Sequence, residues 1–181
     1  MNCHSCGAPM KFDHEKIYFS CEYCTSLFFP EESLDGIRAT DEETNLSCPV
    51  CALPLVIAYA GKTRLFNCQK CRGVLVEQAI FLPLIHYIRS KSKGPPIHPP
   101  PLRLEELKRK VFCPRCRNPM DTHPYGGPGN IVIDNCPRCQ LNWLDHNELH
   151  RITRSPDRTM DEIYRQIGQE KLFGAQKHKG S

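Results

Sequence analysis

Twelve cysteines are the residues of this 181-residue chain with the clearest chemical potential. They form six C-x-x-C pairs with none left over: Cys3/Cys6, Cys21/Cys24, Cys48/Cys51, Cys68/Cys71, Cys113/Cys116 and Cys136/Cys139. Two cysteines three residues apart on a tight turn can direct both sulfurs at one point. Two such turns supply the four thiolates of a closed tetrahedral zinc site. We therefore predict that all twelve cysteines are metal ligands.

The spacing of the pairs groups them into three sets. Within the sets, 14, 16 and 19 residues separate the two pairs, whereas 23 and 41 residues separate neighbouring sets. The second and third spacings match the zinc pattern C-x2-C-x15–20-C-x2-C, and the first is one residue shorter. The prediction is three four-cysteine sites holding three Zn²⁺ ions per chain. Four thiolates also bind iron, so a rubredoxin-like iron protein, or a sensor of redox state or zinc, is an alternative.

An internal repeat accompanies the cysteines. Proline and then methionine or leucine follow each first pair, at Pro9-Met10, Pro54-Leu55 and Pro119-Met120. A bulky residue stands four positions after each second pair: Phe28, Leu75 and Trp143. These apolar side chains are expected to pack beside the metal, because a module of about 40 residues buries too little surface to fold without a metal or disulfide.

The elements that position the cysteines are expected to be short antiparallel hairpins with the metal at one end. The fold class is thus a small metal-stabilised α+β protein of three tandem zinc ribbons. Strands are expected at 17–19 and 27–29 in the first ribbon, 55–60 and 64–67 in the second, and 131–133 in the third.

Helices are expected after the second and third ribbons and near the C-terminus. Residues 79–88 are apolar and helix-like, with a proline that begins or kinks the helix. Asp145, with Glu148 three residues later, predicts a capping box that opens a helix to residue 154. Apolar residues at helical spacing predict an amphipathic helix that begins at residue 157.

The predicted organisation is an acidic zinc ribbon at 1–44, a basic zinc ribbon with an apolar helix at 45–92, a linker at 93–101, a third ribbon with its helix at 102–155, a C-terminal helix at 156–173 and a disordered tail at 174–181. The linker contains five prolines and one glycine, a composition typical of a semi-rigid spacer. We expect it to decouple the third ribbon from the others.

The third ribbon carries a longer motif than its cysteines. It reads C-P-R-C, Pro119-Met120, C-P-R-C, Trp143-Leu144-Asp145 and Glu148-Leu149. This motif resembles the transcription-factor-IIB-type zinc-ribbon family of small bacterial proteins, and the resemblance is clearest over residues 113–150. It implies zinc binding, and the first two ribbons look like diverged copies. The family usually has glycine two residues after the last cysteine, where this chain has Leu141 and the second ribbon has Gly73.

Charge is distributed unevenly along the chain. The formal net charge of +4 becomes about −2 when twelve thiolates and three Zn²⁺ ions are counted. Residues 1–44 hold nine acidic and three basic residues, whereas residues 45–94 hold one acidic and seven basic residues. A basic face of the second ribbon would bind phosphates or an acidic protein; its candidate residues are Lys62, Arg64, Lys70, Arg72 and Arg89.

The function predicted from these features is a non-enzymatic zinc-binding scaffold or adaptor with a protein partner. Every cysteine has a ligand role, so none is free as a nucleophile, and no catalytic or cofactor-binding residues are assigned. A nucleic-acid-binding or transcription-associated protein is the alternative, but no aromatic residues are interleaved with the basic ones for base stacking. The first residues lack the basic and apolar regions typical of a signal peptide, and no apolar run is long enough for a membrane helix. We therefore expect a cytoplasmic protein with reduced thiols and no membrane partner; its oligomeric state is not indicated.

Overall fold

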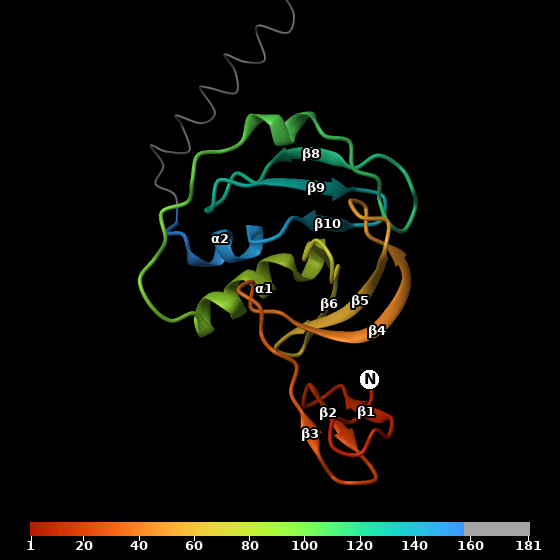
Figure 1. The fold of residues 1–181 in the computed structure, drawn as a ribbon. Helices are drawn as coiled ribbons and strands as arrows, with labels where there is room; N and C mark the ends of the chain where they lie inside the picture. The colour runs from red at the N-terminus through yellow and green to blue at the C-terminus, as the bar shows by residue number, and fades with distance from the viewer. Residues whose placement is uncertain (158–181) are drawn as a thin grey trace, which may run out of the picture.

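The structure is a computed structural model that describes residues 1–157. A small N-terminal module (residues 1–30) projects from a larger part of the molecule, here called the twin body (residues 38–157) (Figure 1). From residue 158 on, the expected C-terminal helix and tail lie outside the described residues. Within residues 1–157, no helix has the length and hydropathy needed to cross a bilayer.

The N-terminal module is a three-stranded antiparallel sheet with the order β1-β2-β3. Its strands are β1 (Met10–Asp13), β2 (Tyr18–Cys21) and β3 (Leu27–Phe28). The register places Phe12 opposite Phe19 and Phe19 opposite Phe28, so these three rings share one face. β2 and β3 overlap the two strands predicted for this module.

The twin body is built around one seven-stranded antiparallel sheet with the order β4-β5-β6-β7-β10-β9-β8. Its strands are β4 (Arg38–Ser47), β5 (Pro54–Ala60), β6 (Thr63–Asn67), β7 (Val74–Glu77), β8 (Asp121–Pro124), β9 (Val132–Cys136) and β10 (Leu141–Leu144). The second and third four-cysteine modules therefore lie in a single sheet, which is continuous across the β7–β10 pair.

An approximate two-fold axis relates the two halves of this sheet. Each half is a three-stranded meander, β5-β6-β7 or β8-β9-β10, and β7 pairs antiparallel with β10. Leu75 stands four residues after Cys71 and lies opposite Trp143, which stands four residues after Cys139. Equivalent residues of the repeat thus face each other, and the axis passes between Leu75 and Trp143.

The proline-rich segment 93–101 is bound to the helix of the third module. The N–H of Ile97 donates to the carbonyl of Arg154 at 2.9 Å, and the Arg154 guanidinium donates to the carbonyl of Pro95 at 2.7 Å. The expectation that this linker decouples the third ribbon is wrong, because β7 and β10 join the second and third modules directly.

Strand β4 was not predicted, because its sequence is polar and contains three consecutive acidic residues. It runs across the ribbon boundary expected at residue 44. Two register shifts interrupt its pairing with β5. The hydroxyls of Thr40 and Thr44 donate to the carbonyls of Ile57 and Leu55, each at 2.8 Å, and replace part of the ladder. Irregularity and charge protect this edge of the sheet from further pairing.

Two helices lie on one face of the sheet (Figure 1). α1 (Gln78–Lys91) overlaps the helix expected at 79–88 and contains Pro83. α2 (Glu148–Arg154) is shorter than expected, and its N-cap is Asn147 with φ of 67° rather than Asp145. Only half of the predicted capping box forms, in which the Glu148 carboxylate accepts the Asp145 N–H at 2.6 Å. A short 3-10 helix, η1 (Leu104–Lys108), precedes the third module.

The two faces of the sheet bury separate apolar clusters. Alternate residues of β7 point to opposite faces, as expected for a strand. Val74 and Val76 join the cluster beneath α1 and α2, whereas Leu75 joins Trp143 in the cluster that contains the cysteines. Leu75 and Trp143 are fully buried, which confirms the prediction that both pack beside the metal sites. Phe28, the equivalent residue of the N-terminal module, is only half-buried.

The N-terminal module contacts the twin body through a small aromatic junction. Phe12 packs on Tyr59 with ring centroids 5.7 Å apart, and Ile17 lies in the same buried cluster. His14 Nδ1 and the Tyr59 hydroxyl form a hydrogen bond of 2.7 Å. The face of the module that carries Phe12 is thus the one turned toward β5.

Candidate metal centres

The structure brings the twelve predicted ligands together in three groups of four. In each group the four Sγ atoms lie within 4.8 Å of one another. The groups are Cys3, Cys6, Cys21 and Cys24; Cys48, Cys51, Cys68 and Cys71; and Cys113, Cys116, Cys136 and Cys139. One pair of Sγ atoms in each group shows the spacing: 3.4 Å for Cys3–Cys24, 3.6 Å for Cys48–Cys71 and 3.7 Å for Cys116–Cys136. Zinc–sulfur bonds of ~2.3 Å in a tetrahedron place the sulfurs roughly 3.8 Å apart, so each group fits one Zn²⁺.

The same backbone turn presents the sulfurs in all six pairs. The residue directly after the second cysteine has a positive φ between 54° and 75° in every pair: Gly7, Thr25, Ala52, Arg72, Arg117 and Gln140. In five pairs its N–H donates to the carbonyl of the first cysteine, at 2.7 to 3.0 Å. Only one of these six residues is glycine, so the closed turn offsets the cost of the left-handed conformation for the other five.

Backbone N–H groups also point at the sulfurs. The N–H of Ser5 lies 3.4 Å from Cys3 Sγ, and that of Cys139 lies 3.4 Å from Cys136 Sγ. The hydrogen bond from Ser5 lowers the pKa of Cys3 to about 6. A similar bond from Asn118 lowers the pKa of Cys116 to about 7. These donors favour the thiolate, which is the form that binds metal.

Burial has the opposite effect on other thiols. It raises the pKa of Cys48 to about 11 and that of Cys139 to about 12. Four thiolates cannot all be charged at so short a distance without a cation between them. A bound divalent ion supplies that charge, which is why a coordinating thiol is deprotonated.

Three histidines near the cysteines in sequence have other partners. His14 bonds to Tyr59, and His123 Nδ1 donates to the carbonyl of Pro124 at 2.9 Å. His4 lies against the ring of Phe28, with centroids 5.8 Å apart. Each four-sulfur group is therefore complete without an imidazole ligand.

The Trp-Leu-Asp motif of the third module forms a hydrogen-bonded unit next to its metal site. Trp143 Nε1 donates to the Asp145 carboxylate at 3.0 Å, and the guanidinium of Arg109 forms ion pairs with both Asp145 and Asp134. Because Arg109 and Trp143 hold the Asp145 carboxylate, it is not available to cap α2. The sequence analysis did not predict this role of Arg109, because its two carboxylate partners lie 36 and 25 residues away along the chain.

Buried charge accumulates around this unit. Asp134 is fully buried, and burial raises its pKa, although Thr122 and Arg109 both donate to it. Burial also raises the pKa of Glu148 to about 8. The pKa of Arg109 is raised by its two carboxylate partners despite its own burial. The cluster attaches the segment before the third module to strand β9 and to the start of α2.

The glycine that distinguishes the second module from the third has a packing reason. A Cβ on Gly73 would lie 2.2 Å from Cζ2 of Trp143, so no side chain fits there. The two-fold axis relates Gly73 and Trp143 to Leu141 and Leu75, which lie in the same buried cluster. The pair Gly73–Trp143 and the pair Leu141–Leu75 therefore occupy equivalent positions on the two sides of the axis. The left-handed residue is Gln140, so the turn does not need glycine at Leu141.

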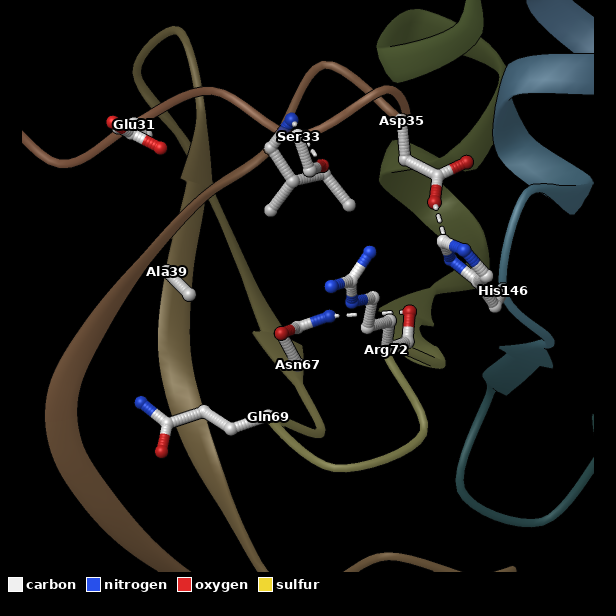
Figure 2. A pocket seen from close by; sticks show the side chains of 9 residues that line it. Glu31, Ser33, Asp35, Ala39, Asn67, Gln69, Arg72 and His146 are labelled. Carbon is white, nitrogen blue, oxygen red and sulfur yellow. Dashed lines mark hydrogen bonds and ion pairs between the residues drawn. The ribbon is translucent and has the colours of Figure 1, made fainter.

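A cavity of about 210 Å³ lies where the connecting segment 31–37 meets both halves of the twin body. Figure 2 shows Arg72 near its centre, with Asp35 and His146 at one side. Asp35 is 2% exposed and accepts the N–H groups of Asn147 at 3.2 Å and His150 at 2.7 Å. A carboxylate distant in sequence thus supplies the side-chain cap of α2, which no local sequence pattern could predict.

The five proposed basic residues do not share one role. Arg89 is held by the carbonyls of Ile152 and Ser155, each at 3.0 Å, and by Asp157. Arg64 lies over the ring of Phe66 at 5.6 Å. Arg72 lines the cavity, and Lys62 and Lys70 are exposed. Arg89 is thus part of the contact between α1 and the end of α2.

Comparison with known proteins finds a family model that matches the third module. No curated protein and no solved structure matches the chain significantly. The family model described as a transcription factor zinc-finger, of the transcription-factor-IIB zinc-ribbon type, matches residues 112–155. This match covers the third four-cysteine group, its Trp-Leu-Asp unit and α2, and it confirms the resemblance predicted from the sequence. Residues 112–155 are similar to a transcription-factor-IIB-type zinc ribbon, and the three cysteine groups are zinc sites.

Proposed function

We propose that the chain is a non-enzymatic adaptor of the reducing cytoplasm, in which three zinc ribbons hold surfaces for a protein partner. The observation that carries this proposal is the closure of all three metal sites by four sulfurs each. A catalytic zinc keeps a coordination position open for water or substrate, whereas four cysteines fill the tetrahedron. No cysteine of the chain is left over for covalent catalysis.

A protein partner is favoured over nucleic acid by the fate of the basic residues. Arg89 uses its guanidinium inside the twin body, and Arg72 lines the same cavity as Asp35 and Glu31. Strand β4, which follows the N-terminal module in the sequence, also carries three consecutive exposed acidic residues. A phosphate backbone binds through exposed basic side chains, and the interior position of Arg89 removes one of the five candidates.

The proposal is tested by capture from a nuclease-treated lysate of the native host. The zinc-loaded chain is expected to retain a defined set of proteins. A matched sample treated with chelator should lose them, because the surfaces depend on the folded modules. Retention of no protein by the zinc-loaded chain would contradict the adaptor function.

A titration with duplex and single-stranded oligonucleotides decides the alternative. At about 150 mM salt we expect no sub-micromolar binding by the full-length, zinc-loaded chain. Tight binding that is weakened by charge reversal at Arg64 and Lys70 would instead support a nucleic-acid-binding protein.

A further inference from the structure

All three modules contain the same meander of three strands. Strands β1-β2-β3, β5-β6-β7 and β8-β9-β10 are each antiparallel and neighbours in order. In each, the third strand follows the second cysteine pair. The third strands are therefore equivalent elements: β3 in the N-terminal module and β7 and β10 in the twin body.

Two of these third strands already pair with each other. In the twin body, Leu75 lies opposite Trp143, and the N–H of Gln78 donates to the carbonyl of Gln140 at 2.9 Å in the same register. Antiparallel residue pairs alternate between hydrogen-bonded and non-hydrogen-bonded. The Leu75–Trp143 pair is therefore non-hydrogen-bonded. The residues that flank Leu75 in β7 and Trp143 in β10 direct their backbone N–H and C=O groups at the other strand.

β3 is an edge strand with the same backbone orientation. Cys21 N–H donates to the carbonyl of Ser26 at 2.9 Å, and the register pairs Phe19 with Phe28. By the same alternation, the backbone groups of Phe28 point to β2, and those of Leu27 and Phe29 point to the open edge. Within residues 1–157, no strand pairs with that edge.

The side chains beside this edge are apolar and exposed. Leu27 is 54% exposed and Phe29 is 56% exposed, and the Phe29 ring lies 5.4 Å from that of Tyr18. They lie on the face opposite to Phe12, which contacts the twin body. Pro30 follows, at the position of Glu77 in β7, where the backbone N–H points away from the partner strand. Its missing N–H therefore leaves the open edge intact.

We propose that the open edge of β3 pairs antiparallel with β3 of a second copy of this chain and reproduces the β7–β10 pairing between subunits. A two-fold axis then passes between Phe28 and Phe28 of the partner subunit. Leu27 lies opposite Phe29 of the partner subunit, and the symmetric contact repeats on the other side. Four exposed apolar side chains are covered, and both strand edges are closed.

Sedimentation equilibrium of the zinc-loaded full chain, from about 10 μM to about 1 mM, tests the oligomeric state. We expect a reversible dimer. Phe29→Lys should weaken it by at least tenfold, because two charges then enter the apolar pairs. Leu82→Lys is the matched control, since Leu82 is 57% exposed on α1 and distant in sequence from β3. Each variant should keep three zinc ions, which shows that it is folded.

A complementary pair of variants tests the register. Leu27→Glu and Phe29→Lys alone should each dimerise at least tenfold more weakly than wild type, and their mixture should form a heterodimer with one ion pair across the axis. In a mixture of ¹³C-labelled and unlabelled wild-type chains, NMR should show contacts from Leu27 methyls to the Phe29 ring of the partner subunit. A monomer at all concentrations, a dimer that tolerates Phe29→Lys, or no heterodimer would overturn the proposal.

Discussion

The N-terminal module and the twin body use the same metal-binding turn in different surroundings. In the twin body, two modules share a sheet and bury two apolar clusters, one of them covered by α1 and α2. The N-terminal module has no helix within the described residues, and its only apolar cluster is shared with β5. Pairing of two ribbons thus supplies the core that a single ribbon lacks.

This difference separates the contributions of metal and of apolar burial to folding. A structural zinc contributes an apparent ~10–16 kcal/mol in small zinc-finger peptides, which is also folding free energy. Burial of apolar surface adds about 25 cal/mol per Å², and this term is large only where side chains are fully enclosed. We therefore expect the N-terminal module to depend on its own metal alone, and the two halves of the twin body to depend on each other.

The largest expected effect comes from removing one ligand in each part. Cys21→Ser should release one zinc and unfold residues 1–30, while the twin body remains folded. Cys136→Ser should also release the zinc of the third module, and the loss should spread through β7 and β10 to the second module. Hydrogen exchange read by mass spectrometry measures both, and emission of Trp143 should shift to longer wavelength only in Cys136→Ser.

The same two variants can also contradict the expected dependence of the second module on the third. Native protection of residues 45–92 in Cys136→Ser would show that the second module folds alone. In that case the shared sheet would not be the cooperative unit.

A smaller effect is expected at the two-fold axis of the twin body. Gly73→Ala should lower the free energy of unfolding by about 1–3 kcal/mol, because its Cβ would overlap Trp143. In a Trp143→Leu background the same substitution should cost much less. Denaturant unfolding of the four proteins gives the coupling energy between the two sites. Additive costs would contradict the packing account of Gly73.

The pH dependence of the twin body provides a third test. Burial raises the pKa of Glu148 to about 8 from 4.5, so its stabilising contribution is complete below pH 4.5 and is lost as the pH rises through 8. Glu148→Gln should remove this dependence. Relative to wild type, the variant should gain about 4 kcal/mol between pH 5 and about pH 8.5. Glu105→Gln on exposed η1 is the control, and parallel curves for Glu148→Gln and wild type would contradict the burial effect.

The smallest effect is expected at the junction of the two parts. Tyr59→Phe removes the hydrogen bond to His14 and should cost no more than about 1 kcal/mol. Three zinc ions should remain bound, but NMR residual dipolar couplings should show a wider range of orientations for residues 1–30. An unfolded N-terminal module in this variant would show that the module is not held together by its own metal.

The metal sites could be predicted from the sequence because their geometry is local. A C-x-x-C pair fixes the direction of two sulfurs, and the distance between pairs identifies which turns meet. The burial of Leu75 and Trp143 followed from the repeat, since equivalent residues pack in equivalent places. The resemblance of the third module depended on the Trp-Leu-Asp residues, which form one hydrogen-bonded unit.

The features missed by sequence analysis depend on contacts between distant segments. Strand β4 is polar because it lies at an edge, so its composition did not predict a strand. Asp35 caps α2 across more than one hundred residues, and Arg109 takes the carboxylate of Asp145 that the capping box was expected to use. The segment 93–101 was expected to separate the modules because proline-rich segments are extended. The pairing of β7 with β10 instead holds the second and third modules together.

Elemental analysis of the purified full-length chain tests the central claim most directly. Three closed four-cysteine groups predict three zinc ions per chain and a colourless protein. Cys21→Ser and Cys136→Ser measured in parallel should each contain fewer ions than wild type. A red protein with mostly iron, or a ratio near one metal ion per wild-type chain, would contradict the account.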